Sequence, residues 1–222
     1  MSSSLHVKIC GLKTPEAVEA VLNNGASHIG FIFFPKSPRH VDAAQAFALA
    51  TPARGKAQIV AVTVNADDAQ LDQIVSVLQP DILQLHGKET PERVMQIKQR
   101  YDLPVIKAFS IRDNSDFDAV LSYQGIADRF LFDAKAPERS ELPGGNGVSF
   151  DWDLLKDRAE FGNYMLSGGL NAGNIVQALA KTGSFAIDIS SGVESEPGKK
   201  DVKLIDAFFA ALQQIKNTNK TA

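Results

Sequence analysis

Two hydrophobic patterns alternate along the chain. Short runs rich in β-branched and aromatic residues predict strands, and stretches with apolar residues three and four positions apart predict amphipathic helices. The predicted strands are Val7–Cys10, His28–Phe34, Ala57–Val64, Ile82–Leu85, Val105–Phe109, Arg129–Asp133, Tyr164–Ser167 and Phe185–Ile189. The predicted helices are Pro15–Asn23, Ala43–Ala50, Asp68–Leu78, Pro91–Arg100, Asp116–Tyr123, Trp152–Ala159, Ala172–Lys181 and Val202–Ile215.

Residues typical of helix ends occur at the expected places. Thr14 and Thr90 each precede a proline, the combination of capping hydroxyl and proline that begins many helices. Asn171 is the expected cap of a later helix. Gly25 and Gly183 follow helical stretches, where a left-handed residue commonly ends a helix.

The strict alternation of strand and helix indicates parallel strands joined by right-handed crossovers. Eight such units in 222 residues predict an α/β protein with a closed (β/α)8 or TIM barrel, a single domain over residues 1–222. The alternative is an open doubly wound sheet, but the first turn, Cys10-Gly11-Leu12-Lys13, lacks the glycine pattern of dinucleotide-binding sheets. The polar residues 217–222 are expected to form a flexible tail.

Composition and charge narrow the class of protein. A hydrophobic content of 44%, a charged content of 22% and a net charge of −3 are ordinary for a globular protein and favour neither nucleic acid nor a membrane as partner. The single cysteine excludes an intramolecular disulfide and a zinc cluster and suggests a reducing, cytoplasmic setting. The start of the chain lacks the pattern of a signal peptide, and no apolar run is long enough to span a bilayer.

Candidate catalytic residues stand where strands end, the active-site edge of such a barrel. Cys10 ends the first strand, although a lone cysteine is often plain core. Asp133 ends an apolar strand, which disfavours its charged form and suits a general acid; it could instead cap a helix or pair with Lys135. Arg39 could grip a carboxylate or lie on the surface, and His86, a candidate substrate-binding residue, could be a structural histidine.

A phosphate site is predicted after the last two strands. Gly168 and Gly169 follow the seventh strand, and Ser190, Ser191 and Gly192 follow the eighth. Glycine lets backbone N–H groups approach an anion, hydroxyls add donors, and a following helix start adds positive potential. These loops form the recurrent phosphate site of the fold, so two ordinary glycine turns are the less favoured interpretation.

A buried ion pair is predicted beneath this edge. Side chains alternate along a strand, so Lys8 faces the same way as Cys10, and Asp188 the same way as Ser190. Because the first and last strands are neighbours in a closed barrel, Lys8 and Asp188 are expected to pair. The ammonium group would then help to lower the pKa of the Cys10 thiol, as a thiolate base requires.

The whole set of motifs resembles one family, phosphoribosylanthranilate isomerase of tryptophan biosynthesis. The resemblance covers essentially the whole chain, and the order and spacing of its motifs are specific. The motifs are Val7–Gly11, Gly30–Arg39, Leu83–Gly87, Leu131–Asp133, Gly144–Gly147 followed by Phe150-Asp151-Trp152, Leu166–Leu170, Ser190–Glu194 and Pro197–Lys200.

This resemblance implies the Amadori rearrangement of N-(5'-phosphoribosyl)anthranilate, a small phosphosugar, with no cofactor, metal or obligatory protein partner. By resemblance, Asp133 is the general acid, Cys10 the general base, Arg39 the anthranilate carboxylate ligand and Asp188 a ligand of sugar hydroxyls. Phosphate binding is assigned by resemblance to the backbone around Gly168, Gly169, Ser190, Ser191 and Gly192.

The longest irregular stretch, Ala134–Phe150, is typical of a lid or binding loop, and by resemblance the loop around Gly144–Gly147 corresponds to a mobile loop that covers the substrate. The stretch Ala134–Pro143 makes this loop long and charged, which departs from the family, so no loop contact is carried over. Two alternatives remain. The isomerase of histidine biosynthesis performs the same rearrangement with an aspartate in place of Cys10 and a second phosphate site. A non-catalytic barrel that senses phosphosugars would need neither Cys10 nor Asp133.

Overall fold

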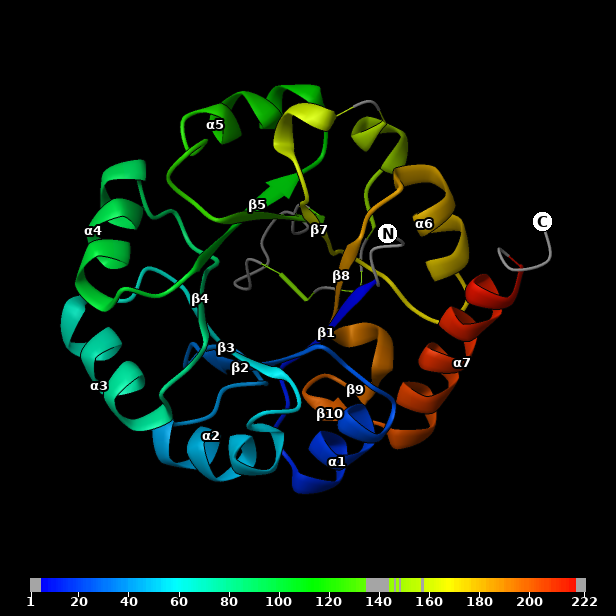
Figure 1. Cartoon of the computed structure of the whole chain (residues 1–222), viewed down its shortest axis with the longest axis horizontal. Helices are drawn as coiled ribbons and strands as arrows, with labels where there is room; N and C mark the ends of the chain where they lie inside the picture. The colour runs from blue at the N-terminus through cyan, green and yellow to red at the C-terminus, as the bar shows by residue number, and fades with distance from the viewer. Residues whose placement is uncertain (1–4, 135–143, 146, 148, 157, 219–222) are drawn as a thin grey trace.

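Eight parallel strands form a closed barrel in which spatial order equals sequence order (Figure 1). The computed structural model describes residues 5–134, 144–145, 147, 149–156 and 158–218. The single closed barrel predicted from the sequence is confirmed, and the open sheet is wrong. The strands are β1 (His6–Cys10), β2 (His28–Phe33), β3 (Gln58–Thr63), β4 (Ile82–Leu85), β5 (Val105–Ile111), β6 (Arg129–Ala134), β7 (Met165–Leu166) and β8 (Ala186–Ile189).

Helices surround the barrel as an outer ring (Figure 1). They cover the outward faces of the strands because each carries an apolar stripe toward the sheet. The α-helices are α1 (Pro15–Asn23), α2 (Ala43–Ala50), α3 (Asp68–Leu78), α4 (Pro91–Tyr101), α5 (Asp118–Leu121), α6 (Ile175–Thr182) and α7 (Val202–Thr218).

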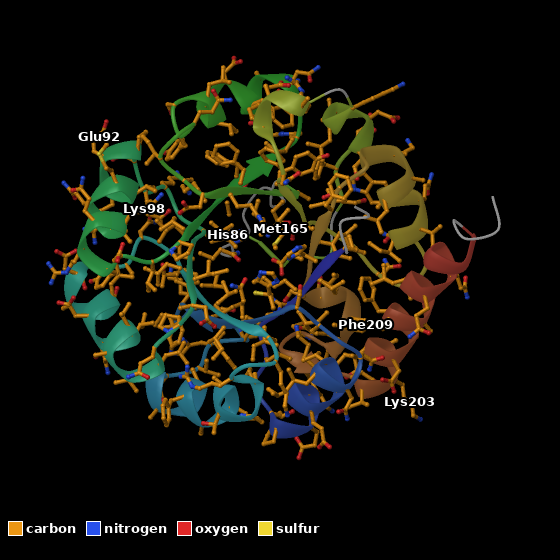
Figure 2. All side chains as sticks on the ribbon, in the orientation of Figure 1. His86, Glu92, Lys98, Met165, Lys203 and Phe209 are labelled. Carbon is orange, nitrogen blue, oxygen red and sulfur yellow. The ribbon has the colours of Figure 1, made fainter. Side chains whose placement is uncertain are left out.

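The strands divide the apolar residues into two sets. Along β3, Ile59 and Ala61 belong to the large core that includes the helices, whereas Val60 and Val62 belong to a smaller cluster with Cys10 and residues of other strands. This alternation is the period of two expected of a strand. The smaller cluster therefore fills the barrel interior and forms the floor on which a site at the strand ends rests. Figure 2 shows Met165, another member, inside the ring, while Glu92 lies on the outer side of α4.

Most predicted helix ends are confirmed. Thr14 accepts a hydrogen bond from the N–H of Ala17, and Thr90 caps α4 in the same way. Gly25 and Gly183 have φ angles of +79° and +62°, the left-handed conformation that ends α1 and α6. The cap at Asn171 is wrong. Its carboxamide oxygen accepts from the N–H of Gly173 and closes a turn, so α6 begins only at Ile175.

Two predicted helices are broken into shorter segments. In place of Asp116–Tyr123 there is a 3-10 turn, Asn114–Phe117, followed by the single turn of α5. In place of Trp152–Ala159 there are two 3-10 turns, Trp152–Leu155 and Ala159–Phe161. Lys156 adopts an extended conformation (ψ 134°), which interrupts the helical path between them.

Two further differences concern the end of the chain. An antiparallel hairpin that the sequence did not predict, β9 (Glu194–Glu196) and β10 (Lys199–Lys200), follows β8. Helix α7 extends to Thr218 and so includes the first two residues of the predicted flexible tail; the last four lie outside the described residues. Among the residues that the structure describes, no helix has the length and apolar character needed to cross a membrane.

A buried histidine makes the stability of this fold depend on pH. His28 is 2% exposed on β2, and its Nδ1 lies 2.8 Å from the Ser27 hydroxyl. Burial, helped by the charges of Lys8 and Arg129, lowers the pKa of His28 to about 4. The unfolded chain therefore binds a proton near pH 6.5 that the folded chain does not bind, so stability is present above pH 6.5 and is lost as the pH falls.

We predict that His28 costs the protein about 2 kcal/mol of unfolding free energy at pH 5 relative to pH 8. Urea unfolding over this pH range measures the loss, and His28→Gln should remove this part of the pH dependence. An NMR titration should find the His28 ring neutral at pH 5. A titration midpoint near 6.5 would contradict the prediction.

Candidate active site

A single pocket collects the predicted site residues at the carboxyl ends of the strands. Cys10, Arg39, His86, Asp133 and Asp188 all line it. Arg39 is only 3% exposed, so its interpretation as a surface arginine is wrong. The predicted phosphate residues Gly168, Gly169, Ser190 and Ser191 line the same pocket, and Gly192 does not.

The predicted ion pair beneath Cys10 is confirmed. The Nζ of Lys8 lies 2.9 Å from Oδ1 of Asp188, and both side chains are buried. The register of β1 on β8 places the two residues directly opposite each other. Gly30 of β2 makes room for this arrangement, since a Cβ there would come within 3.0 Å of both the Cys10 sulfur and the Lys8 Nζ.

Lys8 acts on the pKa of the Cys10 thiol in the expected direction, but other effects outweigh it and the pKa is raised overall. Burial raises the pKa of Cys10, and the Asp188 charge adds to this effect, while Lys8 and Lys200 act in the opposite direction without overcoming it. Burial alone would lower the pKa of Lys8, but the neighbouring Asp188 charge, together with the interaction with Cys10, leaves it raised. Lys8 therefore remains an ammonium at neutral pH, and the thiol of the free protein remains protonated.

Asp133 stands on β6, three strands away from Cys10 around the barrel. Its Oδ1 accepts a hydrogen bond of 2.9 Å from the N–H of Ala134, and its Oδ2 lies 3.4 Å from Nε2 of His86. The Nδ1 of His86 lies 3.1 Å from Nε2 of Gln84. His86 thus connects β4 to the candidate acid, and Figure 2 shows it inside the ring of helices. Lys135, the alternative partner of Asp133, lies outside the described residues.

The predicted phosphate end of the pocket differs in detail from expectation. A 3-10 turn, Ser191–Val193, begins directly after β8, but α6 begins five residues after Leu170, so no α-helix start adjoins the Gly168-Gly169 turn. Gly192 packs against the Leu170 carbonyl behind the pocket wall. A Cβ at position 192 would overlap this carbonyl, which explains why the position is a glycine. The Ser190 hydroxyl donates to the Cys10 carbonyl at 3.1 Å and joins the phosphate end to the thiol strand.

Sequence reasoning missed an apolar wall of the pocket, formed by Ile32, Phe34, Val62, Val64 and Leu170. The period of two could have found part of it, because Ile32 and Phe34 continue the inward face that contains Gly30. Gly144 and Gly145 of the predicted lid also line the pocket, while residues 135–143, 146 and 148 of that loop lie outside the described residues. No group of three or more possible metal-ligating side chains occurs in the described part of the chain.

Comparisons with known proteins identify this arrangement. The family model described as N-(5'phosphoribosyl)anthranilate (PRA) isomerase matches residues 7–211. The chain belongs to the phosphoribosylanthranilate isomerase family. It is 64% identical over 209 residues to the N-(5'-phosphoribosyl)anthranilate isomerase of Brucella canis, covering 94% of both chains.

Solved structures of phosphoribosylanthranilate isomerases share the fold. The enzyme from Thermotoga maritima is 34% identical with a TM-score of 0.85, over 95% of this chain and 99% of that one. A phosphoribosyl anthranilate isomerase in complex with reduced 1-(o-carboxyphenylamino)-1-deoxyribulose 5-phosphate is 32% identical with a TM-score of 0.82, over the same shares of the two chains.

The raised pKa of Cys10 gives a direct chemical prediction. Alkylation of the ligand-free protein by iodoacetamide requires the thiolate, so its rate should rise with pH. The rate should reach half its maximum at a pH above the pKa of an ordinary cysteine thiol. The rate, followed by mass spectrometry from pH 6 to 11, measures this midpoint. A midpoint below the ordinary value would show that Lys8 overcomes burial.

Proposed function

We propose that the chain catalyses the Amadori rearrangement of N-(5'-phosphoribosyl)anthranilate to 1-(2-carboxyphenylamino)-1-deoxyribulose 5-phosphate, a step of tryptophan biosynthesis. The observation that carries the proposal is one pocket lined by Cys10, Asp133 and the turns of the predicted phosphate site. The family membership points to the same reaction.

Opening the furanose ring requires a proton on the ring oxygen. We assign this proton to Asp133, whose Oδ2 faces His86 while Oδ1 is engaged by the backbone of its own strand. Asp133 is 4% exposed and has apolar neighbours on β6, so its carboxyl is held away from bulk water at the pocket wall. His86 orients this carboxyl from β4.

The second step removes the C2' proton from the ring-opened Schiff base, and we assign it to Cys10. The electron pair of the broken C–H bond moves toward the substrate's own iminium carbon and nitrogen, and the resulting enol tautomerises to the ketose. A thiolate is required as base, and the Lys8 ammonium favours it. The iminium adds a second positive charge beside the sulfur at the step in which the base acts.

Binding at the two ends of the substrate places it between these groups. In the proposal the phosphate binds at Gly168, Gly169, Ser190 and Ser191, the carboxylate binds Arg39, and Asp188 contacts the sugar hydroxyls. The apolar wall, with Phe34 and Val62, accepts the aromatic ring. Holding the substrate between the acid and the base makes each proton transfer effectively unimolecular, and this supplies much of the rate acceleration.

Two other interpretations have less support. A phosphosugar-sensing barrel without activity would have no need of Cys10 and Asp133 in the same pocket as the phosphate turns. The isomerase of histidine biosynthesis is disfavoured by the family match. A single free cysteine and biosynthetic relatives support the cytoplasm as the place of action.

We predict that Cys10→Ser and Asp133→Asn each lower kcat by at least about 10²-fold, because each removes one proton-transfer group. The fluorescence loss of N-(5'-phosphoribosyl)anthranilate measures turnover, and circular dichroism checks that the variants fold. Asp128→Asn, a change just before the same strand as Asp133 and away from the pocket, should keep normal turnover. A variant of Cys10 or Asp133 with normal turnover would remove that residue from the mechanism.

A further inference from the structure

The Arg39 guanidinium forms a two-point hydrogen-bonded contact with one carboxylate, that of Glu194. Its Nε donates to Oε1 of Glu194 at 2.8 Å and its Nη2 donates to Oε2 at 2.7 Å, a two-point contact that fixes the plane of the group. The Nη2 also donates to the Gly145 carbonyl at 3.2 Å. The arginine and glutamate side chains are 4% and 3% exposed, so water does not weaken the pair.

Glu194 is itself fixed by the hairpin β9–β10. The Lys200 Nζ forms an ion pair with Oε1, and the Gly198 N–H donates to Oε2 at 3.1 Å. Burial alone would raise the pKa of Glu194, but Arg39 and Lys200 outweigh it and leave that pKa lowered, so the carboxylate is ionised at neutral pH. Both of its oxygens therefore have two partners each.

Neither Glu194 nor Lys200 lines the pocket, whereas Arg39 does. Arg39 is thus the member of this buried group that lines the pocket, while Lys200 contacts the pocket indirectly by donating to the Ser190 hydroxyl at 3.3 Å. The Nη1, which Glu194 does not engage, lies beside Gly145 of the pocket wall, where a Cβ would come within 2.7 Å of it. Neither Glu194 nor the Gly145 carbonyl accepts from Nη1, so this nitrogen can donate to an anion bound in the pocket.

We propose that Glu194, supported by Lys200, is a positioning residue that aims Arg39 and so sets the preference of the pocket for an aromatic ring bearing a carboxylate. This inference rests on the proposed function. A long arginine side chain loses rotamer freedom when it binds a ligand, and Glu194 removes that freedom before the substrate arrives. Glu194 does not touch the substrate and acts only through Arg39.

The test compares two probes that differ in one group. One is reduced 1-(o-carboxyphenylamino)-1-deoxyribulose 5-phosphate, and the other is the same compound without the carboxylate. The variants are Glu194→Gln, which removes the charge, and Glu194→Asp, which keeps the charge but shortens the reach. Glu196→Gln is the matched control, since Glu196 is exposed on the same strand. Calorimetry measures each Kd, and circular dichroism checks the fold.

For both Glu194 variants we expect the Kd of the carboxylated probe to rise by about tenfold or more, and the Kd of the other probe to stay within about twofold. Glu196→Gln should match the unmodified chain. In an Arg39→Met background, Glu194→Gln should have no further effect on either probe, because the residue through which it acts is gone.

Three results would overturn the inference. Equal losses for both probes would mean a structural role only, no loss for either would mean that Arg39 needs no aiming, and tighter binding of the carboxylated probe would mean that Glu194 competes with the substrate. An unmodified chain that binds neither probe and does not turn over the substrate would instead refute the proposed function, and this inference with it. Should Glu194→Gln fail to fold, Glu194→Asp carries the same comparison.

Discussion

The ion pair between Lys8 and Asp188 is the interaction on which the rest of the site depends. A fully buried ammonium is costly unless a partner neutralises it, and the only way to place Asp188 beside Lys8 is to pair the first strand with the last. Closure of the barrel therefore also brings the Asp188 carboxylate to the Lys8 ammonium beneath the thiol. Gly30 on the neighbouring strand leaves the space in which the lysine reaches its partner.

Above this ion pair, the two proposed proton-transfer groups have different surroundings. Cys10 lies directly above a permanent positive charge, whereas Asp133 lies against apolar neighbours and His86 on the opposite wall. A second group of buried charges, formed by Arg39, Glu194 and Lys200, fixes the position of Arg39 in the pocket wall. The interior apolar cluster, to which Cys10 itself belongs, packs beside these polar groups inside the barrel.

Much of this could be predicted from the sequence, because strand periodicity and barrel closure together determine which side chains face inward. That reasoning placed Lys8 on Asp188 and brought Cys10 and Asp133 to one edge. It found the lowering effect of Lys8 on the thiol pKa but could not weigh it against burial, which outweighs it. It also missed Glu194 as the partner of Arg39, since a contact 155 residues apart through a short hairpin leaves no periodic signal.

The role of this ion pair is tested most directly by a double-mutant cycle on the unfolding free energy with Lys8→Met, Asp188→Leu and both together. Each single variant should lose about 3–5 kcal/mol, because one buried charge is left without its partner, and the double variant should lose less than either. If the two losses simply add in the double variant, the ion pair does not stabilise the site, since the two residues then contribute independently to the unfolding free energy.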